Sequence, residues 1–306
     1  MRVFVAGATG VLGRRLLPVL LAADHEPIAM TRSREKADAF TAAGIEAVVC
    51  DAYDSEGLTR AVASARPEAI VHLLTDLPED INMRRFEQET ASTGRLRREG
   101  THNLVVAAAA AGIERIVAES IAFAYEPQGD WVKDECSPLA TATLPSVAEP
   151  LVELERRVLD AGGIVLRYGT LYGPGTAFTS DGPWAANLRR RRLPIVGAGA
   201  GVFSFLHVDD AASATVAALE HSGPATYNVV DDEPAPVCEW APAYARAVGA
   251  PAPWRAPAWV GRLAAGRMAV SLMNELRGAS NARIKRELGW QPEHSSWREG
   301  FRTALD

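Results

Sequence analysis

The sequence is short of lysine and cysteine, and it has no long apolar run. The lysines number three: Lys36, Lys133 and Lys285. The three cysteines are far apart and outside any metal-ligand spacing, so we expect reduced, packed thiols and no metal site. No apolar stretch approaches the length of a membrane span, and no signal-peptide layout precedes the first strand. We therefore expect a cytoplasmic protein without membrane contact.

The sequence also lacks an excess of basic residues. The net charge is −6 and the isoelectric point is near 5.6, which argues against a nucleic-acid partner. The one basic cluster, Arg189 to Arg192, is more typical of a helix end than of an RNA site. With 306 residues, 48% of them hydrophobic, the chain can bury a large core. Either one large α/β domain or a nucleotide-binding core with a smaller lobe fits this length.

The most informative stretch runs from Arg2 to Arg32. An apolar strand, Arg2 to Ala6, leads into a glycine turn and then into a helix with leucines at helical spacing, ahead of a second strand at Glu26 to Met30. The free N–H groups of such a helix start can bind a pyrophosphate. This strand–turn–helix unit predicts a dinucleotide site whose contacts come from Gly7, Thr9, Gly10, Val11, Leu12 and Gly13.

The end of the second strand indicates which cofactor binds. An acidic residue there would favour NAD(H), but the chain reads Thr31-Arg32-Ser33. Arg32 can pair with a 2′-phosphate, and Thr31 and Ser33 can add hydrogen bonds. We therefore expect NADP(H) rather than NAD(H), with a solvated arginine at a helix start as the alternative.

Further strands alternate with helices through the first half of the chain. The expected strands are 46–50, 69–73, 114–119 and 163–167, and the expected long helix is 84–111. Asp51 and Ala52 follow one strand, where the carboxylate can accept from the adenine amino group or cap the next helix. Leu73, Leu74 and Thr75 follow another and should lie beside the ribose and nicotinamide. We expect His72 to be a packed core residue.

Six motifs give the chain a family resemblance. They are Gly7-Ala-Thr-Gly10-Val-Leu-Gly13, Gly100-Thr-His-Asn-Leu104, Leu166-Arg-Tyr-Gly-Thr-Leu-Tyr-Gly-Pro-Gly175, Phe205-Leu-His-Val-Asp-Asp210, Tyr227-Asn-Val229 and Glu287-Leu-Gly-Trp-Gln-Pro292. In this order they resemble the extended or atypical short-chain dehydrogenases/reductases, the superfamily of nucleotide-sugar epimerases and dehydratases.

The resemblance implies a Rossmann-type α/β fold, a doubly wound parallel sheet with a smaller C-terminal α/β substrate lobe. We expect the NADP(H)-binding core at 1–175, joined by the returning segment 205–230, and the substrate lobe at 176–204 and 231–306. Members of this family often form homodimers through helices that correspond here to 84–111 and 146–161.

The family's catalytic tyrosine and lysine, four residues apart, are missing. In the family the lysine lowers the pKa of the tyrosine, which passes a proton to or from the substrate oxygen. Val147 stands at the tyrosine position and Leu151 at the lysine position. None of the six tyrosines has a lysine four residues later, so a shifted register does not restore the pair.

Three hydroxyls could replace the missing relay. Ile121 occupies the place of the family's catalytic serine, while Ser120 lies one residue before it. Tyr125 keeps the family's substrate-side tyrosine and is our leading proton donor, with a pocket wall as its alternative role. Tyr168 stands where the family commonly has proline and could stack on the nicotinamide, donate its hydroxyl or simply pack. Leu171 should line the same face.

Glu119 ends a strand beside the expected nicotinamide site. A buried carboxylate there is either paired with an arginine or raised in pKa. Arg97 and Arg98 are candidate partners, and Arg97 takes the place of a family asparagine. We predict a structural Glu119–Arg97 ion pair. Farther along, Asp209 and Asp210 are predicted to cap a helix that runs to Glu220.

Substrate binding is predicted from four aromatic residues. Phe203 occupies the position at which sugar-nucleotide enzymes have a diphosphate-binding arginine, so a nucleotide sugar is disfavoured. Phe178, Trp184, Phe203 and Phe205 instead suggest an apolar pocket, with core packing as the alternative for each.

These features leave three functions open. The first is an NADP(H)-dependent oxidoreductase that acts on a hydrophobic carbonyl-type molecule with a non-standard proton donor. The second is an isomerase, dehydratase or cyclase on the same fold. The third is a catalytically silent NADP(H)-binding protein.

Overall fold

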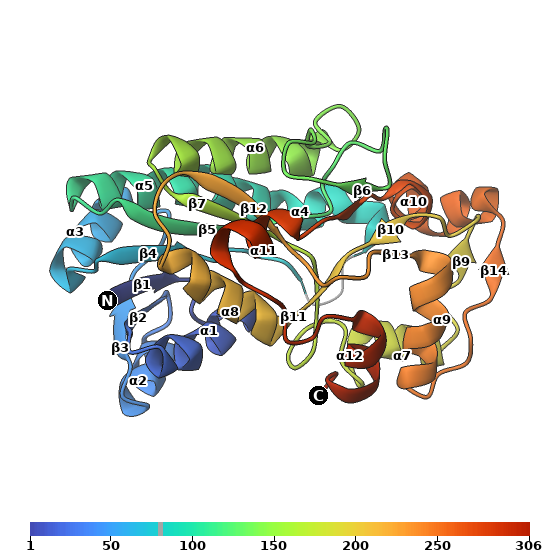
Figure 1. The fold of residues 1–306 in the computed structure, drawn as a ribbon, viewed down its shortest axis with the longest axis horizontal. Coiled ribbons are helices and arrows are strands. Elements are labelled where there is room, and N and C mark those ends of the chain that lie inside the picture. Colours follow the sequence, from blue (N-terminus) through green and yellow to red (C-terminus); the bar gives the residue numbers. More distant parts are fainter. Residues whose placement is uncertain (79–81) are drawn as a thin grey trace.

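A seven-stranded parallel sheet forms the centre of the molecule (Figure 1). The structure is a computed structural model, and it describes residues 1–78 and 82–306. The strand order β12-β7-β5-β4-β1-β2-β3 reverses direction at β1, which confirms the predicted doubly wound Rossmann-type sheet. The strands are β1 (Arg2–Ala6), β2 (Glu26–Thr31), β3 (Glu46–Val49), β4 (Ala69–His72), β5 (Arg115–Ile121), β7 (Ile164–Tyr168) and β12 (Ala225–Val229).

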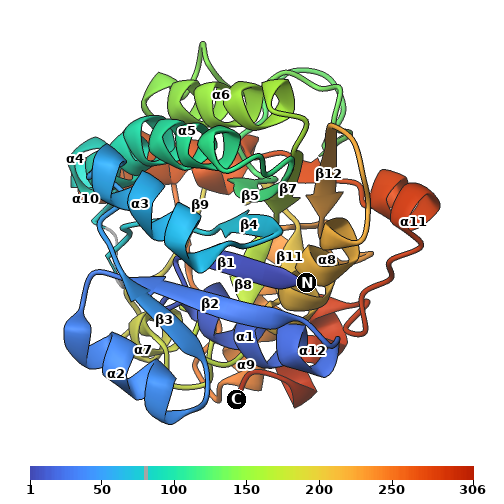
Figure 2. The same cartoon turned by 90° about the vertical axis from the view of Figure 1, so that its left-hand side faces the viewer.

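Helices cover both faces of this sheet, as Figure 2 shows end-on. Below it in that view lie α1 (Val11–Ala22), α2 (Arg34–Ala42) and α8 (Val208–Leu219), and above it lie α3 (Ser55–Ala65), α5 (Thr101–Ala110) and α6 (Pro145–Asp160). Alternate strand residues therefore enter two separate cores. Val117 packs on the α1 and α8 side, whereas Ile116 and Ala118 pack on the side of α3, α5 and α6.

The long helix predicted at 84–111 is interrupted. It begins with a 3-10 turn, η1 (Met83–Arg85), continues as α4 (Phe86–Arg95), and widens into a π-helical turn, η2 (Leu96–Gly100), before α5. Such π turns commonly occur at functional sites because they change the direction of side chains along the helix. Here the π turn contains Arg97.

The C-terminal part forms a smaller unit of helices and short strand pairs. Its helices are α7 (Pro183–Arg189), α9 (Val237–Ala247), α10 (Ala258–Glu275), α11 (Ala282–Leu288) and α12 (Trp297–Thr303). The short pairs are β8 (Thr170–Tyr172) with β11 (Phe205–His207), β9 (Ile195–Val196) with β14 (Arg255–Ala256), β10 (Val202–Phe203) with β13 (Ala235–Pro236), and β6 (Val132–Lys133) with β15 (Gly278–Ala279). The chain returns to the edge of the main sheet only through β12. Within the described ranges, no helix is both long enough and apolar enough to cross a membrane.

Candidate active site

The turn between β1 and α1 has the geometry of a phosphate cradle. Gly7 has a φ of +100°, and a Cβ atom there would lie 2.5 Å from the Leu73 carbonyl oxygen. A Cβ atom on Gly13 would lie 2.3 Å from the Gly7 oxygen, so only glycine lets the helix approach the strand this closely. Gly10 begins α1 without a side-chain cap, which leaves the first helical N–H groups available to a pyrophosphate.

The end of β2 places Arg32 in solvent beside this turn. Its guanidinium is exposed and has no hydrogen-bond or ion-pair partner among the described residues. Thr31 is buried, and its hydroxyl accepts from the Ser33 N–H over 3.1 Å. Ser33 caps α2 by accepting from the Lys36 N–H. Arg32 is thus held on a fixed turn with its charge free for an anion.

The ends of β3 and β4 complete the edge of the sheet. Asp51 is exposed, and one of its carboxylate oxygens accepts from the Tyr53 N–H over 2.9 Å. The cap of α3 is Asp54, so the capping role that we considered for Asp51 is wrong. Ala52 is buried under the loop. On the β4 side Leu73 is buried, Leu74 is partly buried and Thr75 is exposed.

His72 is a buried core residue, as expected. Its Nε2 lies 2.8 Å from the Thr101 hydroxyl, and its Nδ1 accepts from the Leu74 N–H over 3.2 Å. Burial, together with the positive charge of Arg97, lowers the pKa of His72 to about 4. The neutral ring therefore fixes the backbone at the point where β4 meets the site.

This histidine predicts an acid-sensitive fold. An unfolded histidine takes up a proton near pH 6.5 and the folded one only near pH 4, so the His72 contribution is complete above pH 6.5 and is lost as the pH falls towards 4. At pH 5 we expect the free energy of unfolding to be lower than at pH 7 by roughly 2 kcal/mol from this residue. Urea unfolding of the wild type and of His72→Gln at both pH values measures this loss. The contribution of His72 is the difference between the pH dependences of the two proteins' free energies of unfolding. An equal pH dependence in both would contradict the assignment.

The missing catalytic pair is replaced by packed aliphatic side chains. Val147 is 7% exposed and Leu151 is fully buried, and both lie in one apolar cluster with Ala124 and Tyr125. The three lysines of the chain do not substitute: Lys133 donates to the Gln128 carbonyl, Lys285 pairs with Asp232, and Lys36 is exposed on α2. No lysine among the described residues therefore serves this position.

A buried ion pair occupies the interior behind α6. Arg167 on β7 and Glu155 on α6 form a two-pronged pair, with N–O distances of 2.8 and 2.6 Å, and each side chain is 7% exposed. Ser120 is fully buried, and its hydroxyl donates to the same Glu155 carboxylate over 2.6 Å. Ser120 therefore points into this network and not into an open pocket.

Tyr125 belongs to the same network. Its hydroxyl donates to Asn228 Oδ1 over 2.6 Å and accepts from the Arg167 guanidinium over 3.0 Å. Burial raises the pKa of Tyr125 to about 12. Tyr125 is also one of the residues that line the large cleft described below. Its hydroxyl is thus engaged inside the protein.

Tyr168 also turns inward. Its hydroxyl lies 2.7 Å from the Thr215 hydroxyl of α8, and the residue is 2% exposed within the core on that side of the sheet. Burial raises its pKa. The packing alternative therefore describes Tyr168 better than a proton donor does. Leu171, on β8, is partly buried against the same core.

The predicted Glu119–Arg97 ion pair is wrong: within the part of the chain that the structure describes, no such pair lies within 4 Å. Arg98 instead pairs with Glu149 and Glu153. Arg97, on the π turn, is 7% exposed and has no hydrogen-bond partner among the described residues. Burial raises the pKa of Glu119 to about 7, although the charge of Arg97 opposes the shift. The carboxyl of Glu119 therefore holds its proton to a higher pH than an ordinary glutamate does.

The aromatic residues predicted to bind substrate pack against one another instead. Phe178 and Phe205 are buried, and Trp184 and Phe203 are partly buried around Trp240 in the core of the C-terminal unit. Phe178 stacks on Trp184 with centroids 4.7 Å apart, and Phe205 meets Trp240 edge-on at 5.4 Å. None of the four lines the large cleft, so these contacts favour the packing alternative that we left open for each residue.

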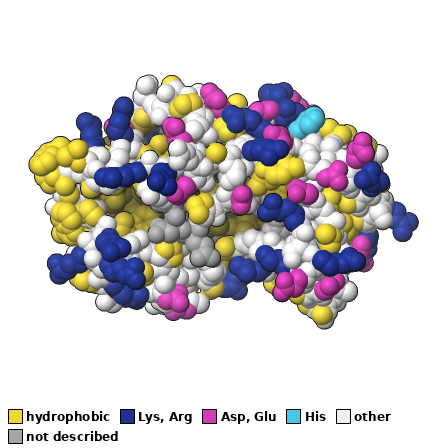
Figure 3. All heavy atoms as spheres, turned by 180° about the vertical axis from the view of Figure 1, so that it is seen from behind, with side chains coloured by type: hydrophobic (Ala, Val, Ile, Leu, Met, Phe, Trp, Pro, Cys, Tyr) yellow, Lys and Arg dark blue, Asp and Glu magenta, His cyan; other side chains and the backbone are white. Residues whose placement is uncertain are grey.

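The cleft lies elsewhere, between the β5 end of the sheet and α10. Its volume is about 810 Å³. Figure 3 shows this part of the surface hollowed, with hydrophobic side chains in the hollow and basic side chains on both sides of it. Apolar lining comes from Met83, Phe86, Phe123, Tyr125, Val270 and Leu272. A cavity of this size and character suits a small organic substrate.

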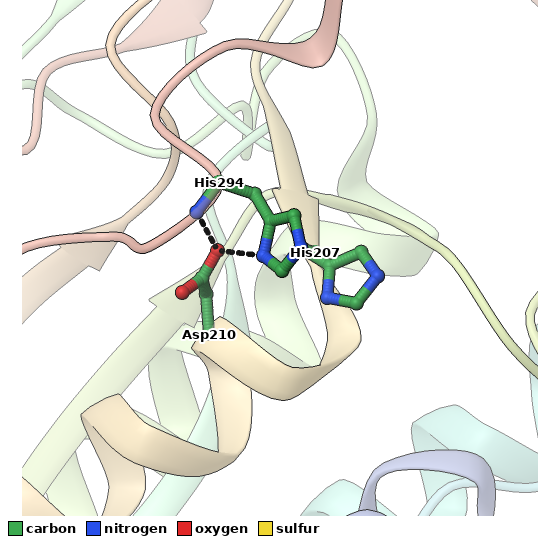
Figure 4. A group of neighbouring side chains, drawn as sticks. All are labelled: His207, Asp210 and His294. Atoms are coloured by element: carbon green, nitrogen blue, oxygen red, sulfur yellow. Dashed lines mark hydrogen bonds and ion pairs between the residues drawn. The ribbon is translucent and has the colours of Figure 1, made fainter. Parts of the chain in front are cut away.

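A cluster of His207, Asp210 and His294 was not anticipated (Figure 4). The expected capping by Asp209 and Asp210 is wrong, because the cap of α8 is His207, whose ring accepts from the Asp209 N–H. Asp210 is buried and accepts from the Glu293 N–H, the His294 N–H and the His294 ring. The His207 ring nitrogens are both used, since the other one contacts the Ala304 carbonyl over 3.1 Å. The cluster therefore fastens the C-terminal segment to α8.

Comparison with known proteins agrees with this geometry. The model of the NAD dependent epimerase/dehydratase family matches residues 3–229, and the chain belongs to this family. A Streptomyces protein called 3-diazoavenalumate denitrifying reductase is 46% identical over 98% of this chain and 99% of its own. These matches identify an enzyme of the short-chain dehydrogenase/reductase type.

Solved structures show the same fold across the whole chain. Thermus thermophilus UDP-glucose 4-epimerase in complex with NAD has a TM-score of 0.73 at 25% identity, covering 100% of this chain and 98% of its own. A human epimerase family protein with NADPH has a TM-score of 0.76 at 22% identity, covering 100% of this chain and 99% of its own.

Proposed function

We propose that the chain is an NADPH-dependent reductase that replaces a diazonium group on an organic acid by hydrogen and releases N2. The Streptomyces relative, at 46% identity over nearly the full length of both chains, is named for a reductive reaction on a diazo compound. The glycine turn and the open helix start of α1 suit the pyrophosphate of a nicotinamide nucleotide, which supplies a hydride when bound.

The absence of a proton relay is the observation that carries this proposal. Reduction of a carbonyl requires one hydride and one proton, and the family's tyrosine–lysine pair delivers the proton. In this chain those positions are Val147 and Leu151, and the hydroxyls of Ser120, Tyr125 and Tyr168 are all engaged inside the protein.

A diazonium substrate needs no such relay. The substrate carbon gains a C–H bond from the electron pair of the hydride, and the C–N electron pair leaves with neutral N2. The balance is R–N2⁺ + NADPH → R–H + N2 + NADP⁺, and no proton appears in it. The protein then has only to position the two reactants, which a cleft of this size can do.

Arg32 supports NADPH over NADH. Its exposed, unengaged guanidinium lies directly after β2, where an acidic side chain would repel a 2′-phosphate. The turn that carries Arg32 is stabilised by a hydrogen bond of 3.1 Å from the Ser33 N–H to the Thr31 hydroxyl.

Glu119 favours a second candidate, reduction of an apolar carbonyl compound. Its pKa of about 7 would allow it to donate one proton per turnover from its place two residues before the end of β5. In that case the rate of carbonyl reduction should fall as the pH rises through about 7, and Glu119→Gln should abolish the reduction.

One experiment separates the two candidates. Purified protein is mixed with NADPH and a ¹⁵N-labelled aryl diazonium carboxylate, and with a matched aryl ketone, while ¹⁵N2 and NADPH absorbance are followed at pH 6 and 7.5, within the stability range of the diazonium ion. We expect one ¹⁵N2 per NADPH consumed, no dependence on Glu119 and little change of kcat with pH. NADPH oxidation with the ketone alone would overturn the proposal.

A further inference from the structure

The walls of the cleft differ in charge from one end to the other. At the end near β5 the lining residues Phe123, Tyr125, Ala140 and Leu144 carry no ionised group. At the other end, η1 and α10 contribute four arginines, Arg84, Arg85, Arg262 and Arg267, and the acids of the lining are Glu87 on α4 and Glu275 on α10. A chain with a net charge of −6 thus places a local excess of positive charge at one end of an apolar cleft.

Three of these arginines are available to bind an anionic ligand. Arg84 donates to the Leu263 carbonyl and so joins η1 to α10. Arg85, Arg262 and Arg267 are exposed, and among the described residues none of them has an ion-pair partner. The acid on α10, Glu275, accepts from the Ser271 hydroxyl over 2.6 Å. The excess charge is therefore not neutralised inside the protein.

A break in α10 brings the arginines together. Gly266 has a φ of +89°, outside the helical range, and a Cβ atom there would meet the Met83 carbonyl at 3.8 Å. The kink therefore lies against η1, with Arg262 one turn before it and Arg267 directly after it. This arrangement gathers basic side chains from two separate segments at one end of the cleft.

We propose that the cleft binds an apolar carboxylate, with its carboxylate at Arg262 and Arg267 and its reacting end beside Phe123 and Tyr125. Arginine forms two-pronged hydrogen bonds with carboxylates, and the aromatic rings contribute apolar contact to the rest of the ligand. The orientation follows because the reacting end must lie at the carboxyl end of β5, where the sheet presents the cofactor site. This inference deepens the proposed function and rests on it for the identity of the reacting group.

A binding experiment tests the proposal without any turnover. Calorimetric titration of the full chain, saturated with NADP⁺, compares trans-cinnamate with methyl cinnamate, which has the same shape but no charge. We expect cinnamate to bind at least about tenfold more tightly, and more weakly as salt is raised. In Arg262→Gln/Arg267→Gln the affinity for cinnamate should fall about tenfold, while that for the ester stays unchanged.

Matched controls make the result decisive. Arg246→Gln removes an exposed arginine at the end of α9, away from the cleft, and should leave both affinities unchanged. Thermal unfolding checks that each variant is folded. Equal affinity for acid and ester, or an unchanged affinity in the double variant, would overturn the proposal. A failure of diazonium reduction would not change these affinities, so the two proposals can fail separately.

Discussion

Replacing Arg167 by methionine is expected to lower the free energy of unfolding by about 3–5 kcal/mol, the range found when one partner of a buried ion pair is removed. The substitution leaves the Glu155 carboxylate, itself 7% exposed, without its two guanidinium hydrogen bonds, and it also removes a donor to the Tyr125 hydroxyl. Urea denaturation at pH 7 measures the loss. Thermal unfolding of the apoprotein should show the same order of stability.

The control is the double variant Glu155→Leu/Arg167→Met. Because no charge is then left buried, this protein should be more stable than Arg167→Met alone even though it carries one more substitution. Ser120 loses its acceptor in the double variant, so full recovery is not expected. A double variant no more stable than the single one would show that the pair is not the main source of the loss.

Replacing Arg32 by alanine is expected to raise the dissociation constant for NADPH by roughly 10- to 100-fold, since hydrogen bonds to charged groups contribute about 1.5–3 kcal/mol. The constant for NADH, which has no 2′-phosphate, should change by less than about threefold. The preference arises because Arg32 is exposed, lies on the turn after β2 and is not engaged by the described part of the chain. Fluorescence titration of the reduced nucleotides measures both constants.

Arg60→Ala serves as the matched control for that experiment. Arg60 is an exposed arginine on α3 whose contact is an ion pair with Glu56, one helical turn away. Its removal should leave both nucleotide affinities unchanged. Equal losses of affinity for NADPH and NADH in Arg32→Ala would contradict a contact between Arg32 and the 2′-phosphate. They would indicate instead that Arg32 contacts the adenine or stabilises the fold.

Local patterns predicted the sheet and the glycine turn well. The β1 strand, the turn at Gly7 to Gly13 and α1 are neighbours in sequence, so the constraints on them can be seen in a short window. The assignment of Val147 and Leu151 to the positions of the catalytic pair stays a prediction; the structure places both residues one helical turn apart on α6. The prediction of His72 as a core residue was correct, because His72 continues an apolar strand and this pattern is visible in a short window of sequence.

Contacts between distant segments were harder to predict. Glu155 and Arg167 were both visible as charges within apolar segments, which was a usable signal, yet their pairing depends on how α6 lies against β7. The π turn adds a change of direction that helical periodicity does not contain, so Arg97 was placed against Glu119 incorrectly. The aromatic residues of the C-terminal unit have the same composition whether they line a pocket or pack together, and only the tertiary contacts distinguish the two.

The buried aliphatic surface of α6 also restricts which substitutions could introduce a proton relay there. A lysine restored at Leu151 alone would carry a charge into a fully dry interior, and a tyrosine restored at Val147 alone would have no cation to activate it. Neither single step is useful without the other. A tyrosine–lysine pair on α6 would therefore require coordinated changes at both positions and in the apolar cluster around them.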